Sequence, residues 1–325
     1  MKRIGTGLGR SLRGLVLGWV VIALGVSGCS SGGSAPIAVD PPEKTRIKVG
    51  VLPIIDAAPL YLGIQRGLFA TEGLTVEPVV INGGAEAIPK LERGQLDLSL
   101  GNYVSFLLAG ADGKPFTVAA DGFQARKNAF LALRLPSSPI TSVADLVGRK
   151  IAVNTRSNII ELMVRSVLRT NGVDPNSVKF VPIPFPKMAG ALQRHEVDAA
   201  VFAEPFIAAA QQALGAQVLF DAASGATADM PIAGYAATRK WAQTNPRTFA
   251  AFARAMVRAQ HLAADRNNVE TILPKYLKID PKTLAVINIG TFPTSLNAVR
   301  LQRVADLMME FNLVRTRPLA ASLLE

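Results

Sequence analysis

The chain repeats a ten-residue pattern: Leu91-Glu-Arg-Gly-Gln-Leu-Asp-Leu-Ser-Leu100 returns as Leu192-Gln-Arg-His-Glu-Val-Asp-Ala-Ala-Val201. Leucine, arginine and aspartate coincide at the first, third and seventh positions, and most other positions hold similar residues. Each copy has the pattern of a helix end, a tight turn and a strand that begins after the aspartate. A strand, a loop and a helix precede both copies, starting near Ile47 and near Ile151. A ten-residue match alone can arise by chance, but this shared order favours two equivalent lobes.

Short apolar strands alternate with helical patterns along the rest of the chain. Strand patterns occupy residues 46–52 and 151–153. Helical periodicity or helix-start residues mark 59–67, 159–172, a stretch that begins at 245 and another that follows 295. This alternation predicts an α/β fold with largely parallel sheets covered by helices.

The loops after the expected strands predict where a ligand would bind, since ligands of open α/β sheets lie beyond the carboxyl ends of the strands. In the first lobe these loops are 53–58, 82–84 and 101–103, and in the second they are 154–158, 183–186 and 203–205. Two such sets that face each other would form a cleft between the lobes, a common place for a small-molecule site.

The first 28 residues have the pattern of an export signal. Four positively charged residues and no acidic residue precede Cys29, and residues 15–26 are apolar. This stretch is shorter than the ~20 residues that a spanning helix needs, which argues against the alternative of an uncleaved anchor. Because it ends in Ser-Gly-Cys29, the segment resembles a bacterial lipoprotein signal. The resemblance implies cleavage after residue 28 and a lipid on Cys29.

Composition excludes several other classes of protein. Loss of the signal lowers the net charge from +11 to +7, and no Lys/Arg tract concentrates it, so we expect no nucleic-acid partner. Cys29 is the only cysteine, and His195 and His261 lie far apart, so we expect no disulfide, metal site or cofactor. Residues 29–45 are rich in Ser, Gly and Pro and predict a flexible linker.

Several motifs occur in order over almost the whole chain after Cys29. They include Val49-Gly-Val-Leu-Pro53, Ala58-Pro-Leu-Tyr-Leu-Gly63, Gly83-Gly-Ala-Glu-Ala-Ile88, Ser142-Val-Ala-Asp-Leu-Val-Gly-Arg-Lys150 and Asp198-Ala-Ala-Val-Phe-Ala-Glu-Pro205. Each motif alone is weak, but the ordered combination resembles the type II periplasmic solute-binding proteins of the nitrate/sulfonate/taurine (SsuA-like) ABC transporter class.

The resemblance implies a two-lobed α/β fold of the periplasmic-binding-protein type II, with mixed sheets flanked by helices. Lobe one would comprise residues 46–135 and 233–325, and lobe two residues 136–232. Hinge crossovers near 133–137 and 231–236 would let the lobes close around a ligand.

The resemblance also implies partners and a location. A monomeric, lipid-anchored receptor on the extracytoplasmic face of the cell membrane (the periplasmic side in a cell with two membranes) would deliver its solute to an ABC permease. The sequence has no Gly-x4-Gly-Lys-Ser/Thr phosphate loop, so ATP hydrolysis would belong to a cytoplasmic ATPase partner.

The candidate ligand-binding residues of the second lobe are Asn154-Thr155-Arg156-Ser157-Asn158, just before a predicted helix. Backbone N–H groups at a helix start, hydroxyl groups and a guanidinium together suit an oxyanion. The alternative is ordinary helix capping by Ser157 or Asn158, with Arg156 in solvent.

The candidate residues of the first lobe follow two strand ends. Asn82, Gly83 and Gly84 end one loop, where the glycines either admit a ligand close to the backbone or simply form a turn. Asn102 and Tyr103 offer an amide and an aromatic face at the next strand end.

Two carboxylates complete the candidate site. Asp56 and Glu204 could accept hydrogen bonds from an amine or an amino-heterocycle, and they argue against a bare anion such as nitrate. Alternatively, Asp56 is solvated and Glu204 caps the following helix. Phe123-Gln124 and Arg126 could stack on or clamp a ligand, but a surface loop is the slightly favoured alternative.

We therefore predict capture of an alkanesulfonate, taurine or nitrate, with a nitrogen heterocycle (a thiamine-type pyrimidine or riboflavin) as the alternative. An enzyme on the same fold is less favoured, because the sequence shows no nucleophile–base pair. A third alternative is a sensor or adaptor that binds a protein partner.

Overall fold

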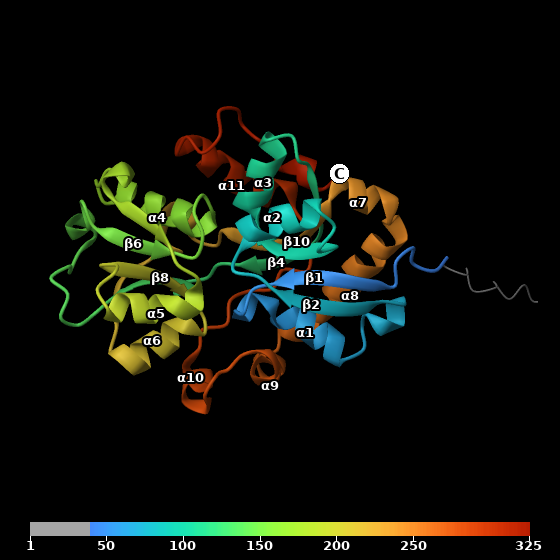
Figure 1. The fold of residues 1–325 in the computed structure, drawn as a ribbon, viewed down its shortest axis with the longest axis horizontal. Helices are drawn as coiled ribbons and strands as arrows, with labels where there is room; N and C mark the ends of the chain where they lie inside the picture. The colour runs from blue at the N-terminus through green and yellow to red at the C-terminus, as the bar shows by residue number, and fades with distance from the viewer. Residues whose placement is uncertain (1–39) are drawn as a thin grey trace, which may run out of the picture. The chain divides into compact units, whose positions relative to one another are not determined.

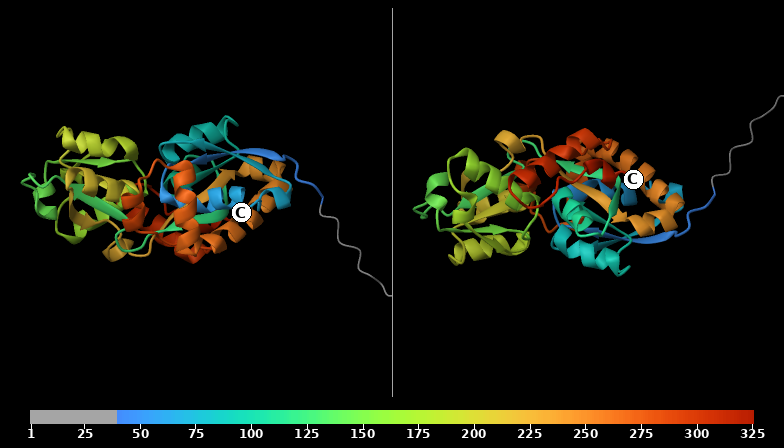
Figure 2. Two further views of the ribbon diagram at one scale, coloured as in Figure 1. Left: turned by 90° about the horizontal axis from the view of Figure 1, so that it is seen from below. Right: turned by 90° about the horizontal axis from the view of Figure 1, so that it is seen from above.

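The computed structural model describes residues 40–325 (Figures 1 and 2), so the signal segment, Cys29 and most of the linker lie outside the described residues. The last linker residues are bonded to the first turn of helix α8 (Pro246–Ala263): Glu43 Oε2 accepts from Thr248 N at 2.9 Å, and Lys44 N donates to Thr248 Oγ1 at 2.9 Å. Within residues 40–325, no helix combines the length and apolarity needed to cross a membrane.

The first sheet has the strand order β2-β1-β3-β10-β4. Its parallel strands are β1 (Arg46–Val51), β2 (Thr75–Val80) and β3 (Leu98–Asn102). Strand β10 (Pro231–Thr238) runs antiparallel between β3 and β4 (Phe116–Gln124). The helices that belong to this part of the chain are α1 (Ala58–Gln65), α2 (Gly84–Glu92), α3 (Tyr103–Ala111), α7 (Arg239–Thr244) and α8.

The second sheet repeats this topology in the order β7-β6-β8-β5-β9. Strands β6 (Lys150–Val153), β7 (Lys179–Pro182) and β8 (Ala199–Ala203) are parallel, and β5 (Phe130–Arg134) runs antiparallel between β8 and β9 (Gln217–Asp221). Its helices are α4 (Ile159–Thr170), α5 (Phe185–Gln193) and α6 (Phe206–Leu214). Both sheets are thus mixed, because each takes one antiparallel strand from beyond its repeat unit.

The repeated aspartate has the same structural role in both sheets. Asp97 N donates to Lys48 O and Asp97 Oδ2 accepts from Lys48 N, both at 2.9 Å. Asp198 forms the same pair of bonds with Lys150, at 2.9 and 2.8 Å. Each aspartate therefore joins the start of its own strand, β3 or β8, to the neighbouring parallel strand, β1 or β6. The sequence repeat thus corresponds to a structural repeat.

The chain passes between the sheets at different residues from those expected. It leaves the first sheet after β4 and enters the second at β5, through residues 125–129 rather than 133–137. It returns through residues 222–230, before β10, rather than within 231–236. From the sequence, residues 130–135 were assigned to lobe one. Residues 130–134 instead form β5, which belongs to the second sheet. The apolar pattern continues from β4 into β5 with only the exposed residues 126–128 between them. The sequence pattern therefore did not show that the chain changes sheet here.

The C-terminal part of the chain spans both groups of elements, as Figure 1 shows. Helices α9 (Arg266–Tyr276), α10 (Pro281–Val286) and α11 (Ala298–Glu310) follow α8. Helix α9 packs on α1, whereas α10 packs on α6. Between α10 and α11, Thr291 pairs with Gln124 at the end of β4, so a third segment runs beside the connection between the sheets.

Candidate functional site

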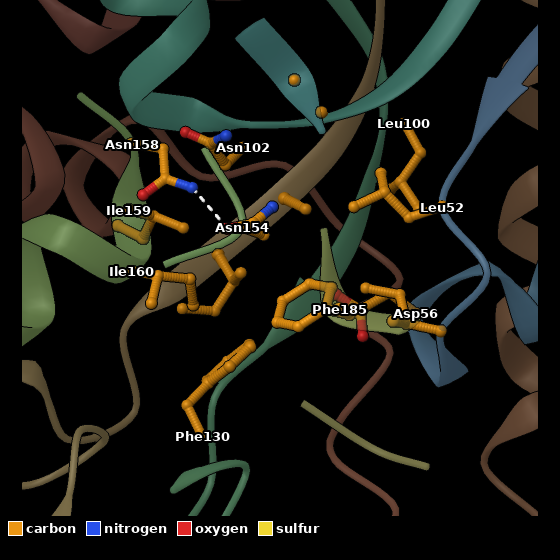
Figure 3. Close-up of a pocket in the computed structure, with 15 residues that line it drawn as sticks. Leu52, Asp56, Leu100, Asn102, Phe130, Asn154, Asn158, Ile159, Ile160 and Phe185 are labelled. Carbon is orange, nitrogen blue, oxygen red and sulfur yellow. Dashed lines mark hydrogen bonds between the residues drawn. The ribbon is translucent and has the colours of Figure 1, made fainter. Parts of the chain in front are cut away.

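A cavity lies where the carboxyl ends of strands from both sheets meet (Figure 3). Its empty volume, including the open mouth, is about 390 Å³. The first sheet contributes the loop after β1, the start of α2, the end of β3 and part of β10; the second contributes β5, the loop after β6, and the first turns of α4 and α5. The lining residues are Leu52, Ile54, Asp56, Gly84, Leu100, Gly101, Asn102, Phe130, Asn154, Asn158, Ile159, Ile160, Phe185, Ile232 and Ala233.

Five of the twelve candidate ligand-binding residues line this cavity. They come from both predicted loop sets, and they are Asp56, Gly84, Asn102, Asn154 and Asn158. The other seven do not line it, namely Asn82, Gly83, Tyr103, Thr155, Arg156, Ser157 and Glu204.

Asp56 is buried, with 2% of its surface exposed, and its Oδ1 has no hydrogen-bond partner in the described residues. Burial raises its pKa from 3.8 to about 7, because a carboxylate loses hydration in an apolar environment. The phenols of Tyr235 and Tyr276 lie close enough to Asp56 to interact with it electrostatically. The Tyr61 and Tyr276 rings stack 3.9 Å apart, and Tyr276 Oη donates to Ile54 O at 3.1 Å. The alternative of a solvated Asp56 is therefore wrong.

The three asparagines lie at the other end of the cavity in Figure 3. Asn158 caps α4 through Oδ1, which accepts from Glu161 N at 3.0 Å, and its Nδ2 donates to Asn154 Oδ1 at 2.6 Å. Asn102 Oδ1 caps α3 by accepting from Ser105 N at 3.0 Å. Its Nδ2 donates no hydrogen bond within the described residues, so it is free to donate to a ligand.

Arg156 does not face the cavity. Its Nε donates to Glu161 Oε2 at 2.8 Å, and its Nη1 donates to Phe180 O at 3.2 Å. Glu161 is buried, and Ser157 N donates to the same oxygen at 2.9 Å. The guanidinium that made an oxyanion site attractive is therefore engaged with an internal carboxylate, whereas the capping alternative left it in solvent; the N-cap is Asn158, as that alternative allowed.

Glu204 joins three segments instead of lining the cavity. Its Oε2 accepts from Ala208 N at 3.3 Å, which caps α6, and its Oε1 accepts from Asn288 N at 3.1 Å. Its backbone oxygen accepts from Ile55 N at 3.2 Å, beside Asp56. Burial raises its pKa. The capping alternative for Glu204 thus matches the structure.

The remaining candidates in the first group have structural partners. Tyr103 is fully buried, and its Oη donates to Asp121 Oδ1 at 2.6 Å. Asn82 is exposed and donates through N and Nδ2 to Glu86 Oε2, both at 2.9 Å. Arg126 is exposed, in agreement with the surface-loop alternative, but this alternative is wrong for Phe123 and Gln124, which lie in β4, with Phe123 buried.

Gly83 and Thr155 meet at the boundary between the two groups of elements. A Cβ atom on Gly83 would lie 2.8 Å from Thr155 Cγ2, and Asn154 Nδ2 donates to Asn82 O at 3.5 Å. Gly84 has a related role within the first group, since a Cβ there would lie 2.8 Å from Asn102 Nδ2. The glycine pair therefore permits close contact with both neighbouring loops.

Sequence reasoning missed the apolar majority of the lining. Phe130 and Phe185 face the cavity from β5 and α5, and Ile159 and Ile160 face it from the first turn of α4. Their position next to strand ends was visible in the sequence, but an apolar residue there is equally typical of the core. No lysine, arginine or histidine is among the lining residues of the described chain.

Two topologically equivalent mixed sheets with a cavity between their strand ends define the architecture of the periplasmic binding proteins. The chain belongs to the NMT1/THI5-like family, whose model matches residues 54–268.

Individual relatives agree with this assignment. The chain is 24% identical over 249 residues to the nitrate/nitrite binding protein NrtA of Nostoc sp., a match that covers 70% of this chain and 56% of the relative. It is 28% identical over 265 residues to the nitrate import ATP-binding protein NrtC of Synechococcus elongatus, covering 74% and 39%. The chain therefore spans less than two thirds of the length of these relatives.

Among solved structures, the alkanesulfonate-binding protein SsuA from Xanthomonas axonopodis pv. citri, bound to MOPS, superposes with a TM-score of 0.71. Its sequence identity is 20%, and the superposition covers 86% of this chain and 97% of that one. At this identity the likeness shows the fold.

Proposed function

We propose that this protein is the extracytoplasmic solute-binding component of an ABC importer and that it captures a small solute between two closing lobes. The observation that carries the proposal is the cavity between equivalent sheets, into which both sheets contribute strand ends and helix starts. Relatives named as a nitrate/nitrite binding protein and a nitrate import ATP-binding protein support the same role and an ABC-type partner.

The finer parts of the proposal rest on the sequence. A lipid on Cys29 tethers the chain to the cell membrane, a monomeric receptor delivers its solute to a permease, and a separate ATPase drives import. The lobes would be residues 46–124 with 231–325 and residues 130–221, joined by hinge connections at 125–129 and 222–230 in place of the boundaries expected from the sequence. Candidate solutes remain the alkanesulfonate, taurine or nitrate type and, alternatively, a nitrogen heterocycle.

Capture without chemical change is the expected activity. Among the described lining residues Asp56 is the one titratable side chain, and none of them is a serine, threonine, cysteine or lysine nucleophile with an adjacent base. We therefore expect a bound solute to be released unchanged.

Native mass spectrometry of the purified full chain, followed by a thermal-shift screen, tests the proposed function. A solute that binds the folded state raises the unfolding midpoint by mass action. We expect a small-molecule adduct or a saturable rise in midpoint that Asp112→Asn, at an exposed position, retains. Absence of any adduct and of any rise across sulfonates, nitrate, amines and nitrogen heterocycles would contradict a solute receptor.

A further inference from the structure

Asp56 is a lining residue of the cavity and holds a buried, unsatisfied acceptor, Oδ1. It lies in the short 3-10 turn Ile55–Ala57 after β1, it is 2% exposed, and its Oδ1 has no partner in the described residues. A buried carboxyl group without a partner is costly, so buried polar groups in native proteins normally have one. An unpartnered group of this kind at the wall of a cavity indicates that the missing partner belongs to a ligand.

The cavity is unsuited to a bare anion. Its described lining holds one carboxyl group and no cationic side chain. Arg156, the predicted oxyanion ligand, pairs with Glu161 at 2.8 Å, and Arg165 pairs with the same carboxylate at 2.9 Å. An anion inside would lose its hydration beside Asp56 and find no cationic side chain, so only the backbone N–H groups at the starts of the lining helices could offset that loss.

The rest of the lining suits an apolar body with few polar groups. Phe130 and Phe185 offer aromatic surfaces, and Ile159 and Ile160 add aliphatic ones. At the end of the cavity away from Asp56 in Figure 3, the unused Nδ2 of Asn102 offers one hydrogen-bond donor. An acceptor at one end and a donor at the other, with apolar surface between them, form a recognition pattern for a small cyclic solute.

We propose that the cavity takes a small aromatic or cyclic solute with a hydrogen-bond-donating nitrogen, an amine or amino-heterocycle, which donates to Asp56. This inference rests on the proposed receptor function and deepens it by assigning the class of solute. It favours the nitrogen-heterocycle alternative over the sulfonate, taurine and nitrate candidates.

The surroundings of Asp56 predict how pH affects binding. The titratable groups that interact with it are the phenols of Tyr235 and Tyr276; Tyr61 stacks on Tyr276, and the carboxyl of Glu204 lies in the adjoining segment. None of these is a cation that would hold Asp56 ionised, and its pKa is raised to about 7. A cationic amine binds the ionised carboxylate better, so its affinity increases as the pH rises through that value.

Isothermal titration calorimetry on the full chain with matched probes tests the inference. The amine probes are benzylamine and 4-aminopyrimidine; benzyl alcohol and pyrimidine have similar bodies without the nitrogen donor; methanesulfonate and nitrate represent the anions. We expect each amine probe to bind at least tenfold more tightly than its matched partner and the anions to bind no more tightly than those partners. Benzylamine affinity should increase about tenfold or more between pH 5.5 and 8, since Asp56 loses its proton in that range.

Two variants separate recognition from folding. Asp56→Asn and Asp56→Leu should remove the pH dependence and weaken benzylamine binding at least tenfold, whereas Asp112→Asn should leave both unchanged. Thermal melts of the unliganded variants check that they fold. If the melting midpoint of a variant is not lower than that of the parent chain, its loss of affinity comes from lost recognition and not from unfolding.

The outcomes distinguish this inference from the proposed function. Binding of methanesulfonate or nitrate in preference to the amines, or amine binding that Asp56→Leu leaves intact, would overturn the assigned solute class while a solute receptor stands. Failure of every probe, together with a purified chain free of any small-molecule adduct, would overturn both.

Discussion

At the scale of single residues, Asp56 combines a place in the cavity wall with an environment that disfavours its charge. Ionisation of its carboxyl is opposed by burial and helped by no cation, and its pKa is therefore raised from 3.8 to about 7. The folded chain binds this proton more tightly than the unfolded chain does. The stabilisation that it supplies is thus complete below about pH 3.8 and is lost as the pH rises through about 7.

Replacement of Asp56 by Asn should remove this pH dependence. The free energy of unfolding of Asp56→Asn should improve relative to the parent chain by up to about 4 kcal/mol between about pH 4 and pH 8. Urea unfolding of both chains across that range measures the difference, with Asp112→Asn as the control. A difference that stays constant with pH would show that Asp56 is ionised in both states at neutral pH.

Glu161 illustrates a buried carboxylate with the opposite environment. It accepts from Arg156, Arg165 and Ser157 N, and these bonds lower its pKa despite burial. Glu161→Gln should lower the free energy of unfolding by about 2 kcal/mol, because two guanidinium groups lose their charged partner. Chemical denaturation measures the loss, and full stability of the variant would contradict a structural role for this cluster.

The sequence predicted that polar residues would lie near the cavity, but it did not predict the direction of each side chain. Asp56, Asn102, Asn154 and Asn158 follow strand ends, and position alone brought them to the cavity. Arg156 follows a strand end too, yet its long side chain reaches Glu161 one turn into α4. Whether such a side chain binds a ligand or an internal partner depends on how it packs. A single sequence does not show that packing.

At the scale of elements, the repeated helix–turn–strand unit was the most predictable part of the fold. Gly94 and His195 occupy the same position in the two copies, and both have left-handed φ values, 67° and 56°. Gly94 and the aspartate three residues after the turn position in each copy are local signals of a tight turn, so the turns could be predicted. The identity of the fourth strand in each sheet could not, because β10 and β5 pair through contacts remote in sequence.

The two repeat aspartates should differ in their contribution to stability. Asp97 is buried and also accepts from Trp241 Nε1 at 3.0 Å and Lys44 Nζ at 2.7 Å. Asp198 is partly exposed, with Arg149 3.7 Å away. Asp97→Asn should therefore cost about 2–3 kcal/mol and Asp198→Asn about 1 kcal/mol. Urea unfolding of the two variants compares them, and an equal or reversed order would contradict the geometry described above.

At the scale of the whole molecule, the proposed capture of a solute between two lobes requires the two groups of elements to approach each other closely. Gly83 has extended backbone, with φ of 169°, so a side chain there causes no backbone strain. Its Cβ would nevertheless lie 2.8 Å from Thr155 Cγ2 across the boundary. Gly83→Val should therefore force the two loops apart and weaken solute affinity about tenfold.

Gly110→Ala is the matched control for this variant. Gly110 lies within α3, and a Cβ there meets no other atom within 4 Å. Calorimetry with the tightest-binding amine probe should show unchanged affinity for Gly110→Ala and reduced affinity for Gly83→Val. Unchanged affinity in both would mean that capture does not need the contact between Gly83 and Thr155.

A crystal structure of the full chain with its bound solute would show which atoms of the cavity hold the solute. We expect solute density between Asp56 and Asn102, with a solute nitrogen about 2.7–3.2 Å from the Asp56 carboxyl group. Solute bound elsewhere on the chain, or an anion in this cavity with Asp56 displaced from it, would contradict recognition of a nitrogen donor by Asp56.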